Sequence, residues 1–418
     1  MKPALISLIS QGLRLAALIS KFVLIMYMGR YLPLDDIGWY GALMGAVVLY
    51  SKLVGMGLNY VVNRECATLG RESLLALLVR QFKMYAPVHL VIALTALIAA
   101  IALKELDIGQ TCLILAILIG EHLGQETLQV LIVRQKQLMA NLTFFLRSGL
   151  PFLIVPILGI LFPETRHFSM ILGLWLVGII VSLVVAVIAL RRNIAHASPS
   201  LPHEPRQWDR AWLVGALKAG LWPMFSSFAL AGSLYADRYG LSVFRSIEQS
   251  GSFVLLWSFA NAVYVLVTTG VTQISYPQMI HAWRNGEKDV FRQIKSRMQR
   301  RQWAVSLGLS LVALGLLQPI LSWLGKAGPE QASLIFGLLL VGFALRAAAD
   351  GLTWTFYARS HDRDVVILNL AALAVAAPAT LILVPMAGIL GAAMVLPISS
   401  AVALGLGLFK ERRLVESP

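Results

Sequence analysis

Long apolar runs separated by short polar segments recur from one end of the chain to the other. A membrane-spanning helix needs about 20 predominantly apolar residues, and these runs reach that length. The pattern therefore predicts an all-α integral membrane protein with about twelve transmembrane helices. We place them at residues 6–29, 37–62, 84–103, 111–133, 142–162, 168–190, 211–236, 251–275, 303–324, 333–355, 365–384 and 388–409.

The basic residues of the connecting segments indicate the topology. With the N-terminus inside, the cytoplasmic segments hold 23 of the 35 Lys and Arg residues, and the opposite segments hold only six. Cytoplasmic loops of membrane proteins collect Lys and Arg, so this bias predicts that both termini lie in the cytoplasm. The remaining six basic residues lie inside spans.

A polar segment with three prolines, residues 191–210, falls near the middle of the chain. It predicts a cytoplasmic linker between an N-terminal six-helix lobe, 1–190, and a C-terminal six-helix lobe, 211–418. Two further segments, 71–85 and 286–303, mix apolar and basic residues at helical spacing. They predict amphipathic helices that lie on the cytoplasmic surface of the membrane.

Composition agrees with the membrane assignment and limits the kinds of partner and cofactor that we expect. Hydrophobic residues make up 58% of the chain and charged residues 13%, against about 25% charged in soluble proteins. The net charge of +14 is explained by the cytoplasmic loops, so we expect no nucleic-acid partner. Cys66 and Cys112 belong to no CxxC or Cys/His cluster, so the sequence predicts neither a metal site nor a cofactor.

Several cations interrupt the apolar runs. Arg14 and Lys21 lie seven residues apart on one face of the first span, Lys52 lies inside the second, and Lys218 lies inside the seventh. A charge inside a membrane costs at least about 2.5 kcal/mol, so it tends to face a protein interior or a wet cavity. We predict that these residues, with Arg147 of the fifth span, line an anion-binding cavity. For Arg14, Lys21 and Arg147 the alternative is that the side chain extends to the membrane surface.

The fourth span carries two acids, Glu121 and Glu126, with His122 between them. An acid inside a membrane can take up and release a proton, and an adjacent histidine can assist. One hypothesis is therefore coupling to a proton or sodium gradient. The alternative is that Glu121 pairs with one of the intramembrane cations. The acids are five residues apart, about 140° around the helix, so they need not face the same way.

Two further charged pairs lie in the second half of the chain. Arg346 and Asp350 are four residues apart and are expected to form a same-face ion pair. Asp237 and Arg238 lie near the outer end of the seventh span. They are interpreted either as a gate or as residues of the membrane interface.

Short motifs near both ends resemble those of a known family. They are Arg30-Tyr31-Leu32-Pro33 before Asp35 and Asp36, Gly38-Trp39-Tyr40, Gly55-Met56-Gly57-Leu58, Arg64-Glu65, and the segment VPMAGILGAAMVLP at 384–397. The chain resembles bacterial oligosaccharide-lipid flippases of the polysaccharide biosynthesis family, within the multidrug/oligosaccharidyl-lipid/polysaccharide (MOP) exporter superfamily.

The resemblance implies a V-shaped, MATE-like fold of two six-helix lobes in the bacterial inner membrane. It implies translocation of an undecaprenyl-pyrophosphate-linked oligosaccharide from the cytoplasmic to the periplasmic leaflet, for O-antigen, capsule or exopolysaccharide synthesis. Expected partners are that lipid-linked substrate, membrane lipids, a glycan polymerase and glycosyltransferases.

Other functions remain open from the residues alone. An ion-coupled multidrug antiporter of the same superfamily should offer acids to a cationic drug, whereas the first two spans offer only cations. A lipid II flippase would share the mechanism and differ in cargo. A membrane enzyme is disfavoured, because the periplasmic loops are short and no Gly-rich phosphate loop is present.

Overall fold

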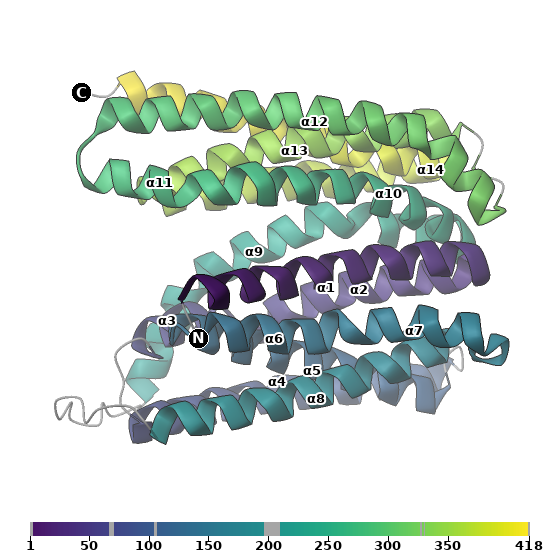
Figure 1. Ribbon diagram of the computed structural model, residues 1–418, viewed down its shortest axis with the longest axis horizontal. Helices are drawn as coiled ribbons and strands as arrows, with labels where there is room; N and C mark the ends of the chain where they lie inside the picture. Colours follow the sequence, from purple (N-terminus) through teal and green to yellow (C-terminus); the bar gives the residue numbers. More distant parts are fainter. Residues whose placement is uncertain are drawn as a thin grey trace. The chain divides into compact units, whose positions relative to one another are not determined.

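The chain is almost entirely helical. The computed structural model describes residues 3–66, 71–103, 107–195, 210–326, 328–329 and 331–416, and no strand occurs among them. The helices in chain order (Figure 1) are α1 (Pro3–Tyr31), α2 (Leu34–Gly55), α3 (Leu58–Cys66), α4 (Arg71–Leu103), α5 (Ile108–Val133), α6 (Gln137–Ser148), α7 (Leu150–Leu161), η1 (Pro163–Thr165), α8 (Phe168–Ala195), α9 (Arg210–Phe244), α10 (Ile247–Val267), η2 (Thr268–Thr272), α11 (Gln273–Arg284), α12 (Lys288–Leu324), α13 (Ala332–Ala358) and α14 (Asp362–Glu416).

The described helices match the predicted number of spans. Eleven segments are long and apolar enough to cross a membrane. The last of them, α14, has 55 residues, or about 80 Å at 1.5 Å per residue, far more than a bilayer core of about 30 Å. Gly388 interrupts it with a φ of 56° and a ψ of −129°, so α14 supplies two spans. The predicted all-α, multi-pass membrane fold is confirmed.

Backbone packing divides the chain into two compact units. Unit 1 takes the described residues of Met1–Tyr27 and Ala46–Met224, and unit 2 takes those of Met28–Gly45 and Phe225–Pro418. The predicted linker at 191–210 lies mostly outside the described residues, which stop at 195 and resume at 210. The division into lobes at 1–190 and 211–418 therefore stays a prediction, as does the side of the membrane on which the termini lie.

In unit 1, α8 packs against α5, α6 and α7, and α3 packs against α4 and α5. The span formed by α6 and α7 is broken at Gly149, which has a φ of −125° and a ψ of −66°. Pro151 follows at the start of α7, where a helix tolerates a proline because the first N–H groups lack intrahelical partners. The span therefore bends at Gly149. Cys66, at the end of α3, lies in an apolar cluster, and burial raises the pKa of its thiol to about 12.

In unit 2, α13 packs against α10, α12 and α14, and α11 packs against α12. A π-helical turn, η2, joins α10 to α11 within a single span. Such turns free backbone carbonyls from the regular helical pattern and occur often at functional positions. The core between these helices is apolar and contains large, fully buried side chains, among them Phe253, Phe336, Phe343 and Phe356.

The predicted surface helices at 71–85 and 286–303 are corrected by the structure. Each forms a helix, but it is the first part of a longer one, because α4 and α12 run without a break into their spans. In α12 the apolar face is used inside unit 2. Phe291 and Met298 pack with Met279 and Ala282 of α11 in a buried cluster, so this face is covered by protein.

Two glycines with positive φ allow a test of the close backbone packing in unit 1, where one of them lies. Gly57 and Gly286 have φ values of 67° and 76°. A Cβ at Gly57 would lie 2.0 Å from the carbonyl oxygen of Gly220, whereas a Cβ at Gly286 would meet nothing within 4 Å.

We expect Gly57→Ala to destabilise the protein more than Gly286→Ala. Both changes cost about 1 kcal/mol of backbone strain, and the clash at Gly57 adds about 1–3 kcal/mol. Thermal unfolding of the purified protein in detergent measures the difference. Equal melting temperatures for the two variants would contradict this close backbone approach.

Candidate functional site

The interior of unit 1 contains two groups of polar side chains, both built around α5. Glu121 and Glu126 are 4% and 5% exposed. Five residues of helix turn them about 140° apart, so they point to different neighbours. Glu121 meets residues of α6 and α8, and Glu126 meets residues of α4.

The first group, called the Glu121 group, comprises Glu121, Arg147, Trp175 and Lys21. Arg147 Nε lies 3.2 Å from Glu121 Oε2, and the Trp175 indole N–H donates to Glu121 Oε1 at 2.8 Å. Gly124 leaves the space for the guanidinium, since a Cβ there would lie 2.0 Å from Arg147 Nη1. Both charges of the pair are therefore held in fixed positions inside the protein.

Lys21 of α1 belongs to this group through electrostatics. It is close enough to Glu121 and Arg147 for their charges to interact. Its ammonium group lies 5.7 Å from the centre of the Phe144 ring, within the range of a cation–π contact. No hydrogen bond or ion pair links Lys21 to any other described residue. It lies beside an acid that Arg147 has already neutralised.

The second group, called the Glu126 group, lies between α4 and α5. The Gln81 amide donates to Glu126 Oε2 at 2.8 Å, and the Tyr85 hydroxyl donates to the same oxygen at 3.4 Å. His122 is fully buried, with its Nε2 3.9 Å from Glu126 Oε1. Neither ring nitrogen of His122 has a hydrogen-bond partner among the described residues.

Three further residues complete the Glu126 group. The Tyr50 hydroxyl of α2 forms a hydrogen bond with His89 Nδ1 of α4, and the His89 ring centre lies 5.2 Å from that of His122. Lys52 of α2 is close enough to Glu126 and His122 for electrostatic interaction. Like Lys21, it forms no hydrogen bond or ion pair with the described residues. The group therefore combines an acid held by neutral donors, two histidines and a lysine.

The other predicted cations of unit 1 are placed differently. Arg14 and Lys218 are exposed in the structure, and no contact brings either into the two groups. Arg147, for which a surface-reaching side chain was one interpretation, is instead 3% exposed and paired. Of the five predicted cavity residues, the structure thus places Lys21 and Arg147 in one group and Lys52 in the other.

Unit 2 holds the remaining predicted residues. Arg346 Nη2 donates to Asp350 Oδ1 at 2.5 Å, so the expected same-face pair is present. The Tyr264 hydroxyl of α10 donates to Asp350 Oδ2, also at 2.5 Å. Both oxygens of the carboxylate are satisfied, which makes a structural role sufficient for this pair.

Asp237 and Arg238 are buried in α9, at 1% and 3% exposure. Asp237 accepts a hydrogen bond from the backbone N–H of Arg238 at 2.8 Å. The Arg238 guanidinium stacks over Trp257 of α10, 3.5 Å from the ring centre. The contacts join α9 to α10 within unit 2. The gate and the interfacial interpretations both stay predictions.

Sequence reasoning missed most of the Glu126 group. Gln81, Tyr85 and His89 lie at spacings of four in α4, which places them on one helix face. That spacing in an apolar span was a usable signal. Tyr50 and Trp175 had no comparable signal, because a single aromatic residue in a span is common. Within the described ranges, no three His, Cys, Asp or Glu side chains form a metal-binding arrangement.

Comparison with known proteins identifies the fold. No family model matches the chain, and no curated protein matches it by sequence. Among solved structures, the chain is similar to the lipid II flippase MurJ in an inward closed conformation, with a TM-score of 0.75, 12% identity, and coverage of 98% of this chain and 87% of that one.

Two transporters of the MOP superfamily are similar over nearly their full lengths. An inward-facing multidrug resistance MATE transporter has a TM-score of 0.72 at 12% identity, covering 98% of each chain. A transporter from Pyrococcus furiosus, described as having a binding pocket of reversed polarity, has a TM-score of 0.65 at 14% identity, covering 98% of this chain and 96% of that one. The chain therefore has the fold of MOP-superfamily transporters.

The buried ion pair between Glu121 and Arg147 leads to a prediction about the stability of the protein. Arg147→Met leaves Glu121 buried without its cation, and breaking a buried pair in this way costs about 3–5 kcal/mol. The double variant Glu121→Gln/Arg147→Met should recover part of that loss. Melting temperatures in detergent measure both.

A matched control is the surface pair Arg292–Asp289, whose side chains are 64% and 88% exposed. Arg292→Met should change stability by less than about 1 kcal/mol. If Arg147→Met melts no earlier than Arg292→Met, the ion pair does not stabilise unit 1.

Proposed function

We propose that this protein is a flippase that moves an undecaprenyl-pyrophosphate-linked oligosaccharide from the cytoplasmic to the periplasmic leaflet of the bacterial inner membrane, for surface polysaccharide synthesis. The observation that carries the proposal is the pair of lysines, Lys21 and Lys52, in membrane-spanning helices of unit 1. Neither forms a hydrogen bond or an ion pair with the described residues.

Charge compensation explains why these lysines suit an anionic cargo. Arg147 and Trp175 engage the two oxygens of Glu121, and Gln81 and Tyr85 both donate to Oε2 of Glu126. The acids are thus held without the lysines, and the two groups together keep a surplus of positive charge. A pyrophosphate withdrawn from water needs charge-assisted hydrogen bonds, which two ammonium groups provide.

The same argument ranks the alternatives. A cationic drug would need a carboxylate that no protein cation neutralises. Glu121 is paired with Arg147, whereas Glu126 is held by the neutral donors Gln81 and Tyr85, so the antiporter stays an alternative. The fold similarity to a lipid II flippase supports a lipid-linked cargo and leaves lipid II as the second candidate. The N-terminal and C-terminal motifs favour the oligosaccharide-lipid cargo. Transport by alternating access would present the head group first to one side and then to the other.

The same geometry supports a proposal of proton coupling through Glu126. An ionised Glu126 attracts Lys52, and protonation of Glu126 removes that attraction. Protonation therefore strengthens the positive field that Lys52 offers to a pyrophosphate. His122, buried beside Glu126 with both ring nitrogens unpartnered in the described structure, is placed to pass the proton on.

The lysines are tested by flipping of the substrate in proteoliposomes. Lys21→Ala and Lys52→Ala should each lower the flipping rate about 10- to 100-fold, since a hydrogen bond to a charged group contributes about 1.5–3 kcal/mol. Lys218→Ala reports whether the exposed cation of α9 contributes.

The control Lys288→Ala removes an exposed lysine at the start of α12 and should flip normally. Protein abundance and restoration of surface glycan in a flippase-deficient strain provide the cellular readout. Full activity of all three test variants would refute the cationic site. Proton-driven efflux of a cationic dye would instead favour the multidrug antiporter.

Coupling is tested with an imposed pH gradient. In wild-type proteoliposomes the gradient should change the flipping rate, and in Glu126→Gln that dependence should disappear, because the neutral amide mimics the protonated acid permanently. Asp350→Asn is the matched control, an acid of unit 2 that pairs with Arg346. If Glu126→Gln responds to the gradient as the wild type does, Glu126 carries no transported proton.

A further inference from the structure

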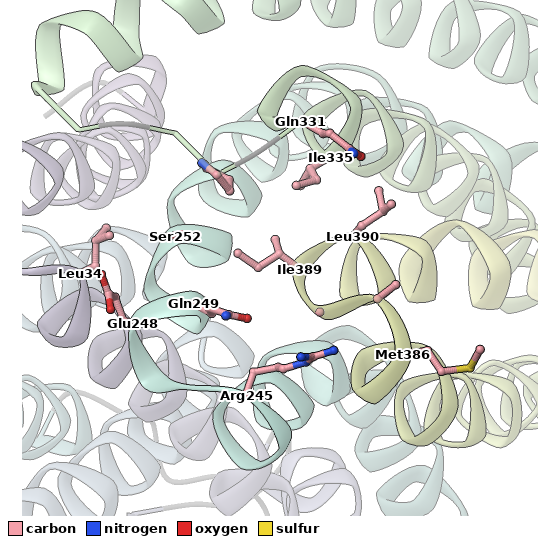
Figure 2. A pocket seen from close by; sticks show the side chains of 13 residues that line it. Leu34, Arg245, Glu248, Gln249, Ser252, Gln331, Ile335, Met386, Ile389 and Leu390 are labelled. Atoms are coloured by element: carbon pink, nitrogen blue, oxygen red, sulfur yellow. The ribbon is translucent and has the colours of Figure 1, made fainter.

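Unit 2 contains an open bowl with a volume of about 750 Å³. It forms where four elements meet, the starts of α2, α10 and α13 and the break in α14 at Gly388 (Figure 2). All its lining residues belong to unit 2. None of them belongs to the Glu121 or Glu126 group, so the bowl is a separate feature of the molecule.

The shape of the bowl is set by backbone contacts. Arg245 donates from Nε to the carbonyl oxygen of Val384 at 3.3 Å and from Nη2 to that of Pro385 at 2.5 Å. These carbonyls lie at the end of the first half of α14, where the last carbonyl groups of a helix have no intrahelical N–H donors. At Gly391 a Cβ would lie 2.0 Å from the Leu383 carbonyl oxygen, so the turn is tight. Arg245 thus holds the wall of the bowl in place.

Four further polar side chains line the bowl. Glu248, Gln249 and Ser252 come from the first turns of α10, and Gln331 precedes α13. None of the four side chains forms a hydrogen bond or ion pair with the described residues. Figure 2 shows Gln249 directed across the bowl toward Ile389 and the break of α14. The apolar part of the wall includes Ile335, Ile389 and Leu390.

These groups select an uncharged, hydroxyl-rich ligand. Each amide offers both a donor and an acceptor, and a carboxylate accepts from neighbouring hydroxyls. Arg245 and Glu248 bring one charge of each sign, so the lining has no net formal charge that would favour an anion. Apolar side chains between the polar ones match the C–H faces of a sugar ring. The volume falls in the range of about 300–1,000 Å³ that is typical of small-molecule sites.

We propose that this bowl is a second binding site, one that holds sugar residues of the cargo apart from its pyrophosphate. The assignment rests on the proposed function, and it adds a carbohydrate site to the cationic one. The predicted topology places the bowl on the periplasmic side. There it would receive the glycan after the head group has crossed, and release from it would complete transport.

The test uses the cargo's own glycan without its lipid. Cells depleted of this protein should accumulate the lipid-linked precursor, and mild acid releases its oligosaccharide from the pyrophosphate. This free oligosaccharide is titrated into the full chain in nanodiscs by calorimetry. We expect binding to the wild type, and about tenfold weaker binding when Gln249→Ala and Gln331→Ala remove two hydrogen-bonding amides.

Gln110→Ala is the matched control. Gln110 is an exposed glutamine in the first turn of α5, and its backbone N–H is capped by Asp107 just as that of Gln249 is capped by Ser246. It should bind the oligosaccharide like the wild type. Absence of binding to the wild type, or equal binding by the Gln249→Ala/Gln331→Ala variant, overturns the carbohydrate site.

The same experiment separates this proposal from the proposed function. If depleted cells accumulate no lipid-linked precursor, the flippase assignment fails, and the carbohydrate site, which rests on it, fails too. If the precursor accumulates and the free oligosaccharide does not bind, only the bowl is wrongly assigned. In that second case, the Gln249→Ala/Gln331→Ala variant should still flip the precursor at the normal rate.

Discussion

A charge inside a membrane-spanning unit must be compensated, and the ion pair between Glu121 and Arg147 meets this requirement at the centre of unit 1. Arg147 lies at the end of α6, directly before the break at Gly149. Gly124 of α5 leaves room for its guanidinium. One buried pair therefore joins α5 to α6, and the indole of Trp175 joins α5 to α8.

This compensation also determines what is left for a ligand. Arg147 pairs with Glu121, and neutral side chains donate to Glu126, so Lys21 and Lys52 have no hydrogen-bond or ion-pair partner among the described residues. The Glu126 group differs from the Glu121 group in the side chains that hold its acid. Its acid is held by an amide and a phenol, which leaves its protonation free to alter the field at Lys52. Under the proposed function, the Glu121 group stabilises unit 1 and the Glu126 group couples a proton to the bound anion.

The sequence predicted the class of fold well, because span length and the distribution of Lys and Arg are dictated by the membrane itself. It also identified Arg346–Asp350, since residues four apart share a helix face. It could not choose a partner for Arg147, because that depends on the break at Gly149 and on the space at Gly124. It assigned the 286–303 segment to the membrane surface, whereas Phe291 and Met298 pack against α11. An amphipathic face does not reveal whether lipid or protein will cover it.

The central claim is that Lys21 and Lys52 bind the pyrophosphate of a lipid-linked cargo. Native mass spectrometry of the protein with undecaprenyl pyrophosphate and with uncharged undecaprenol tests it most directly. The account predicts that the wild type retains the pyrophosphate lipid in preference to undecaprenol, and that the Lys21→Ala/Lys52→Ala variant loses this preference. Equal retention of both lipids by the wild type, or an unchanged preference in the double variant, would contradict it.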